Sequence, residues 1–262
     1  MPIWAYHLSS LKLGLVIVVV MEAVSITGLL LCRRLLIPRF RYHEGVSEAI
    51  SGTVQAIGVF YGITVGLLAV GVWNTHADSS QLVSKEATAI GVLYRDIIEY
   101  PEPTRSQLKG KLREFTVSII DKDWPAQKQG QVVLVGRDIL DDFQSVLYSF
   151  EPTKPSVSAL HNETLRAYNN LIDARRMRIV AIDSSLSSEM WAVIWIGAAV
   201  SIGVAYLYKI EDLKLHAILI SMMACFLGIL LFMIVINDRP FLGNSSLPSD
   251  PYKLILDRVI DR

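Results

Sequence analysis

The sequence has few charged residues and no excess of either sign. Of its 262 residues, 19% are charged, and 25 lysines and arginines balance 25 aspartates and glutamates. Nucleic-acid binding relies on a surplus of clustered basic residues, so this balance argues against a nucleic-acid partner. The chain also has only two cysteines, Cys32 and Cys225, and both lie in apolar stretches. A fold held together by several disulfides is therefore excluded.

The usual catalytic and metal-binding motifs are missing as well. There is no glycine-rich phosphate loop ending in Lys-Ser/Thr, no His-Glu-x-x-His, no Cys-x-x-Cys and no Gly-x-Ser-x-Gly. His76 with Asp78, and His43 with Glu44, offer only two adjacent metal ligands each. We interpret both pairs as solvated polar residues near span ends. The sequence therefore predicts no enzyme, no cofactor and no metal site.

Apolar residues are what the chain has in abundance. They make up 52% of it, and the mean hydropathy is +0.41, which is too high for a disordered chain or an ordinary soluble domain. Four stretches approach the roughly 20 apolar residues that a helix needs to cross a bilayer. They are Leu13–Cys32, Val54–Trp73, Met190–Tyr208 and Leu215–Ile236. The first has too long an apolar core for a signal peptide, so we interpret it as a retained span.

These stretches divide the chain into four parts. We expect spans one and two in residues 1–73, an extramembrane domain in 74–189, spans three and four in 190–236, and a C-terminal tail in 237–262. The extramembrane domain has helical periodicity, as at Leu108, Leu112, Phe115 and Ile119. The fold class predicted is therefore all-α: a four-span integral membrane protein with a helical extramembrane domain inserted between spans two and three.

Local signals predict the internal divisions of that domain and the place of the tail. Prolines at 101 and 103, Trp124-Pro125 with Gly130, and prolines at 152 and 155 should separate four helices. Val132 and Val135 are expected on the apolar face of the third. In the tail, Tyr252–Ile260 forms a short amphipathic stretch. It is expected to lie either against the helical domain or on the bilayer surface.

The basic residues leave the orientation in the cell membrane open. The two short loops carry Arg33, Arg34, Arg39, Arg41, Lys209 and Lys214. The opposite side carries as many near span ends: Lys85, Arg175, Arg176, Arg178, Arg239 and Lys253. The higher density in the short loops favours a cytoplasmic place for them, because long segments translocate largely regardless of charge. Both termini and the middle domain would then lie outside.

Glu22 lies near the middle of the first span, where an ionised side chain is costly. Two interpretations are open. It faces a water-filled path, where a symmetric ring of ionised Glu22 would favour cations over anions. Alternatively it is protonated and hydrogen-bonded to a neighbouring helix, through Thr64 or Ser201.

The second span is rich in glycine. Gly58, Gly62 and Gly66 recur every four residues, a spacing that lets another helix backbone approach closely. Close helix packing is the simpler interpretation. In the alternative, this span lines a pore and its large apolar side chains form a dewetting constriction. The pore and constriction candidates are Ile57, Phe60, Tyr61 and Thr64.

The fourth span is followed by Asn237-Asp238-Arg239-Pro240-Phe241-Leu242-Gly243. Pro240 cannot continue a helix, and Arg239 suits the negative end of the span. Phe241 is expected to anchor at the membrane interface. Asp238 beside Arg239 suggests a local ion pair. Helix termination explains most of this segment without a ligand.

With these residues in view, the chain resembles an uncharacterised bestrophin-like membrane protein family of bacteria and plants, defined by a domain of unknown function. The matching segments are the glycine-rich second span, Glu86-Ala87-Thr88-Ala89-Ile90 with Leu93-Tyr94-Arg95, Asp123-Trp124-Pro125, Arg175 to Arg178, and most distinctively Asp238-Arg239-Pro240-Phe241 with Gly243. Asp123 stands where we expect Glu, and Phe115 where we expect Tyr. Neither departure changes charge sign or bulk.

The resemblance implies an oligomeric ion channel whose second span lines the pore. It also implies a cytosolic middle domain, against the charge-density argument, so both orientations stay open. We predict an oligomeric integral membrane protein, bestrophin-like, that passes ions; its expected partners are the lipid bilayer, further copies of itself and a permeant ion. The alternative is a membrane-anchored scaffold or sensor that binds a partner through its helical domain.

Overall fold

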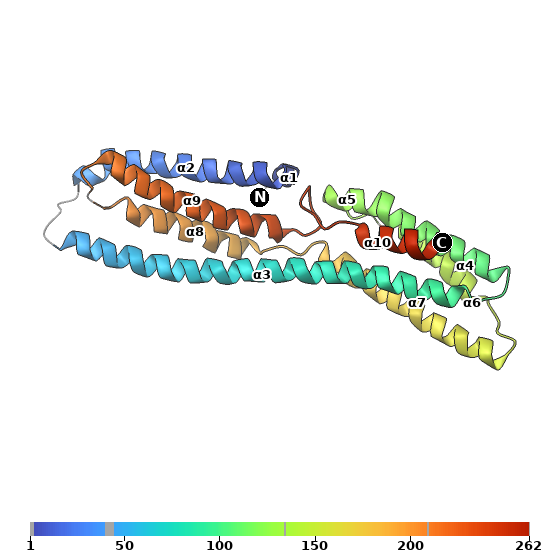
Figure 1. Ribbon diagram of the computed structural model, residues 1–262. Helices are drawn as coiled ribbons and strands as arrows, with labels where there is room; N and C mark the ends of the chain where they lie inside the picture. Colours follow the sequence, from blue (N-terminus) through green and yellow to red (C-terminus); the bar gives the residue numbers. More distant parts are fainter. Residues whose placement is uncertain (1–2, 40–44, 134, 209, 262) are drawn as a thin grey trace. The chain divides into compact units, whose positions relative to one another are not determined.

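The computed structural model describes residues 3–39, 45–133, 135–208 and 210–261 (Figure 1). Within these ranges the regular elements are all helices, and no strand occurs. Four helices are long and apolar enough to cross a membrane, and they coincide with the four predicted stretches. The prediction of an all-α fold with four candidate spans is confirmed. Arg41, His43, Glu44 and Lys209 lie outside the described residues.

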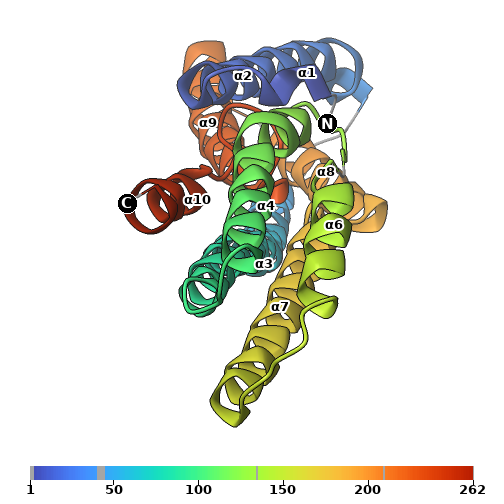
Figure 2. The same cartoon turned by 90° about the vertical axis from the view of Figure 1, so that its right-hand side faces the viewer.

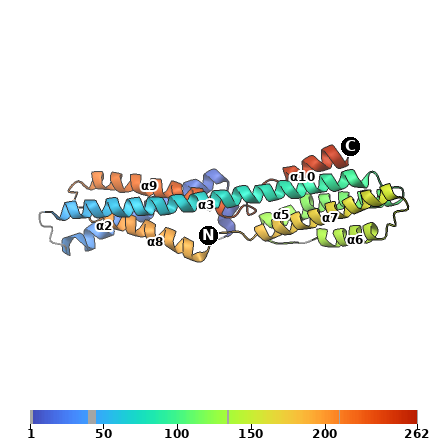
Figure 3. The same ribbon diagram turned by 90° about the horizontal axis from the view of Figure 1, so that it is seen from below.

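The chain divides into two compact units, and the first holds the candidate spans. It comprises Met1–Thr75 and Ser185–Asp238. Its helices are α1 (Ile3–Tyr6), α2 (Ser10–Leu35), the first part of α3 (Val46–Ile97), α8 (Ser188–Ala205) and α9 (Leu213–Asp238). α9 packs along α2 and also contacts α8. α3 is one uninterrupted helix that extends beyond the apolar stretch of span two (Figure 3).

Glycines bring the spans of this unit together, but they are not the predicted ones. A Cβ on Gly228 would lie 3.2 Å from Cα of Val18, and one on Gly14 would lie 3.3 Å from the Phe232 ring. Gly228 and Gly14 thus let α9 and α2 approach closely. Small residues have this role between membrane helices, because lipid supplies no hydrophobic force to press helices together.

The second unit holds the remaining helices. It comprises His76–Ser184 and Arg239–Arg262. After the last part of α3 come α4 (Thr104–Ser118), a π-helical turn (Ile119–Asp123), α5 (Trp124–Lys128), α6 (Gly136–Tyr148), α7 (Pro155–Ala181), α10 (Asp250–Ile255) and a final π-helical turn (Leu256–Ile260). Figure 2 shows α4 beside α6, and these two helices are in contact.

The core of the second unit follows the predicted periodicity with one shift. Leu108, Leu112, Phe115 and Ile119 are fully buried, as expected. However, Trp124-Pro125 does not break the helix, because α4, the π-helical turn and α5 follow one another without interruption and Pro125 is the second residue of α5. The break comes at Gly130, whose φ of 76° is left-handed. Val132 therefore precedes α6 and is exposed, contrary to its predicted place on the apolar face.

The C-terminal segment packs on the helical unit, the first of its two predicted places. Tyr252 and Ile260 are buried in the same core as Leu108 and Phe115. The Tyr94 hydroxyl donates a hydrogen bond to the carbonyl of Ile260 at 3.1 Å. Residues 239–261 therefore belong to this unit rather than forming a separate tail.

Candidate functional site

The apolar part of α3 is uncovered over most of its surface. Phe60 is 71% exposed and Leu67 is 70% exposed. Gly58, Gly62 and Gly66 are also exposed, and a Cβ on any of them would meet no atom within 4 Å. Within one chain, therefore, the glycine stripe contacts no other described helix. The space that the stripe provides is free for another molecule.

The pore candidates on α3 divide between the two sides of the helix. Tyr61 is buried, its hydroxyl donates to the carbonyl of Ile194 at 2.9 Å, and its ring lies against Gly197 of α8. Ile57 is half-buried, whereas Phe60 and Thr64 are exposed. Tyr61 thus holds α3 against α8, and Phe60 is the bulky candidate that remains uncovered.

Glu22 is half-buried in the middle of α2. The Thr64 hydroxyl donates to the carbonyl of Phe60 in its own helix at 2.8 Å. The Ser201 hydroxyl is buried and has no hydrogen-bond partner among the described residues. Neither hydroxyl therefore forms the predicted hydrogen bond with Glu22 within one chain.

The motif after α9 closes the last span differently from the prediction. Asp238 is buried, and its carboxylate accepts hydrogen bonds from the backbone N–H of Leu186 at 2.6 Å and the Tyr6 hydroxyl at 3.5 Å. Arg239 is exposed. The predicted ion pair between Asp238 and Arg239 is wrong, because the buried carboxylate is bonded to Leu186 and Tyr6 instead.

The rest of the motif is part of the helical core. Phe241 is buried, with its ring edge-on to Trp124 at a centroid distance of 5.9 Å, so its predicted role as a membrane-interface anchor is wrong. Pro240 follows the end of α9 as predicted. Gly243 has a φ of 76°, which suits glycine, and its N–H donates to the carbonyl of Lys128 at 2.9 Å.

A buried polar cluster occupies the middle of the helical unit. Glu86 of α3 and Arg178 of α7 are both 0% exposed and form an ion pair. The Tyr252 hydroxyl donates to Oε2 of Glu86 at 2.7 Å. Arg178 also donates to Oε1 of Gln127 at 3.2 Å. One pair of charges thus connects α3, α5, α7 and α10.

A second pair of charges lies in the same cluster. Arg175 lies 4.0 Å from Asp123, and its guanidinium lies over the Phe115 ring at 4.9 Å. Gly136 makes room for it, since a Cβ there would lie 2.6 Å from Nη1 of Arg175. Arg178 similarly lies over the Trp124 ring at 5.5 Å. Such cation–π contacts are favourable once the cation is removed from water.

The electrostatics of the cluster reflect its burial. Desolvation raises the pKa of Asp123, and the nearby Arg175 and Arg178 only oppose this shift. Desolvation also raises the pKa of Tyr252 well above its ordinary value, with Glu86 adding to the effect. Burial lowers the pKa of Arg175. With two acidic and two basic residues, the cluster balances its own formal charge and fastens helices together.

The polar residues considered as metal ligands do not form a cluster. His76 is half-buried and Asp78 is exposed, both on α3. In the described ranges, no group of three or more His, Cys, Asp or Glu side chains is placed to hold a metal ion.

Comparisons with known proteins place most of the chain in one family. The model of the bestrophin-like domain matches residues 16–252. The crystal structure of a mutant bacterial bestrophin homologue from Klebsiella pneumoniae superposes with a TM-score of 0.65 at 12% identity. That match covers 96% of this chain and 98% of the other, and at such low identity it shows the fold alone. No curated protein matches the chain.

Proposed function

The chain belongs to the bestrophin-like family, and from this premise we propose that it assembles with further copies of itself into an ion channel of the cell membrane. Its four helices that are long and apolar enough to cross a bilayer support a membrane location. The observation that carries the proposal is the uncovered surface of α3, which presents exposed glycines on one face and Phe60 on another. A bare glycine stripe on a spanning helix suits contact with a second copy.

The extramembrane part of α3 also offers a surface to another copy. A groove of about 790 Å³ runs between α3 and α7. Its α3 side carries the small residues Ser80, Ser84 and Thr88, all exposed, and its α7 side includes Ala167 and Ala174. These small residues, alongside larger ones such as Lys85 and Met177, leave room for part of a second copy. This groove supports assembly along α3 beyond the membrane.

In the assembled channel, α3 lines the axis. Phe60 forms the apolar constriction, with Ile57 and Thr64 nearby on the helix, while Tyr61 fixes α3 to α8. A narrow apolar ring gates by excluding water. The packing of residues 239–261 on the unit that follows span two supports a topology in which α8 and α9 return the chain to the same side of the membrane.

The scaffold or sensor function is the second candidate, and the same groove between α3 and α7 favours it. There the groove would hold a partner protein instead of a second copy. The two functions differ in one consequence, since only a channel conducts ions.

The test is the ion current through purified protein in lipid bilayers. We expect the wild-type protein to conduct, and Phe60→Ala to raise the conductance roughly severalfold because a shorter ring of side chains is less able to exclude water. Leu15→Ala is the control, since Leu15 is an exposed residue of α2. Absence of current would reject the channel, and an equal effect of both substitutions would reject Phe60 as its constriction.

A further inference from the structure

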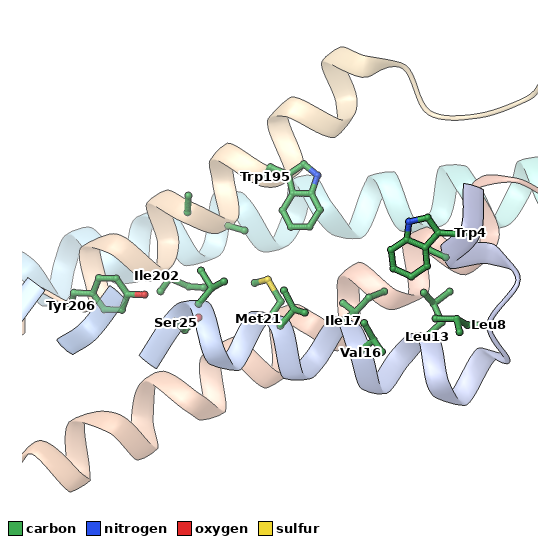
Figure 4. A pocket seen from close by; sticks show the side chains of 15 residues that line it. Trp4, Leu8, Leu13, Val16, Ile17, Met21, Ser25, Trp195, Ile202 and Tyr206 are labelled. Carbon is green, nitrogen blue, oxygen red and sulfur yellow. The ribbon is translucent and has the colours of Figure 1, made fainter. Parts of the chain in front are cut away.

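The membrane unit contains an apolar cavity of about 470 Å³ that the proposed channel function does not use. Figure 4 shows α2 on one side of it and α8 on the other, with Met21 and Ile17 reaching in from α2 and Trp195 from α8. The volume is within the range of about 300–1,000 Å³ typical of small-molecule sites. The cavity is therefore large enough for a ligand.

The lining selects an apolar occupant. It consists of aliphatic residues and methionine, together with aromatic rings and a serine. Its lining residues with polar side-chain atoms are Trp4, Trp195, Ser25 and Tyr206, and the Ser25 hydroxyl is itself buried. A cavity lined in this way excludes water, and left empty it would forfeit packing contacts along its whole length.

The cavity runs lengthwise between α2 and α8, and its two ends differ in their lining. Trp4 and Leu13 lie near one end, and Ser25 and Tyr206 near the other (Figure 4). Twelve residues separate Leu13 from Ser25, about 18 Å along a helix. Half of a hydrocarbon core is about 15 Å, so an acyl chain lying in the cavity reaches past the middle of the bilayer. Trp4 precedes the apolar stretch of α2, where a tryptophan meets the headgroup region.

We propose that this cavity binds one acyl chain of a bilayer phospholipid, with the headgroup near Trp4 and the end of the chain near Ser25. The bound chain fills the space between α2 and α8 and stays with the protein when the surrounding lipid is removed. The site depends only on the candidate spans, so it stands whether or not the protein conducts ions.

Labelling by a photoactivatable phospholipid tests this site. Purified full-length protein is incubated with phosphatidylcholine carrying a diazirine on its acyl chain, illuminated and mapped by mass spectrometry. We expect a diazirine near the carboxyl end of the chain to label residues 4–13. A diazirine near the methyl end should label the segment from Met21 to Ser25 and the facing part of α8.

A matched pair of variants controls the test. Ala199→Trp fills the cavity and should reduce this labelling at least about tenfold, equal to about 1.4 kcal/mol of binding. Val200→Trp places the same side chain on the neighbouring exposed residue, outside the lining, and should leave labelling unchanged.

Depth-independent labelling spread evenly over α2 and α8 would overturn the proposal. Absence of lipid from the cavity, as when a second copy covers it, would also overturn it. If Ala199→Trp does not fold, the wild-type depth map decides.

Discussion

Glu86→Gln is expected to destabilise the protein by about 3–5 kcal/mol, a fall in Tm on the order of 10 °C. The amide keeps the size of the side chain but removes the charge that faces Arg178. Arg178 is 0% exposed, so its cation would stay buried without its carboxylate. The Tyr252 hydroxyl would lose a charged acceptor as well. Thermal unfolding of the purified protein in detergent, followed by circular dichroism, measures the loss.

Two further variants distinguish the effect of breaking a buried ion pair from the effect of removing a charge at the surface. Glu163→Gln removes an exposed partner of Arg166, and such surface pairs contribute about 0–1 kcal/mol, so Tm should change little. The double variant Glu86→Gln with Arg178→Met should recover part of the stability, because no unpaired charge then remains buried. A Tm of Glu86→Gln equal to that of Glu163→Gln would show that the cluster does not stabilise the helical unit.

Gly62→Leu is expected to abolish assembly while leaving the single chain folded. A Cβ at this position meets no atom of its own chain within 4 Å, so the protomer has room for the side chain. In an assembly packed along α3, leucine would hold the neighbouring backbone away. Overpacking costs about 1–3 kcal/mol at each contact, and a symmetric assembly repeats the contact. Native mass spectrometry in detergent measures the number of chains per complex.

Gly203→Leu is the matched control. Gly203 lies on α8, and a Cβ there also meets no atom within 4 Å, yet this glycine is not part of the stripe on α3. Its variant should assemble like the wild-type protein. Should Gly62→Leu retain the wild-type number of chains, the glycine stripe would not be an assembly surface.

The sequence predicts the helices well because their signals are local. Apolar length gives the four candidate spans, and the spacing of Leu108, Leu112 and Phe115 gives the buried face of α4. The positions of prolines predict less well where a helix ends. Pro125 resembles a helix breaker in the sequence, but the helical segment continues through it, directly after the π-helical turn Ile119–Asp123.

The buried cluster is harder to predict because its members come from distant parts of the chain. A signal was present: Glu86 lies between Val83 and Ile90, and Arg178 follows Leu171 and Ala174 on a helical face. A charge of each sign on two apolar faces suggests a buried pair. Pattern alone, however, does not say which faces meet.

The uncovered side of α3 could not be distinguished from a packed one by sequence. The repeat of Gly58, Gly62 and Gly66 indicates close approach of another helix, yet the close contacts between described helices of one chain involve other glycines, among them Gly14, Gly197 and Gly228. The same local pattern serves contact within a chain and contact between chains. Only the three-dimensional arrangement leaves one stripe bare.

The most direct measurement of pore lining by α3 is the accessibility of a cysteine at position 60. A charged thiol reagent is added to bilayers in which Phe60→Cys conducts, and the current is followed over time. The account predicts that the reagent blocks this current but not that of the wild-type protein, whose Cys32 and Cys225 serve as the internal control. An unchanged current through Phe60→Cys would contradict the placement of α3 along the ion path.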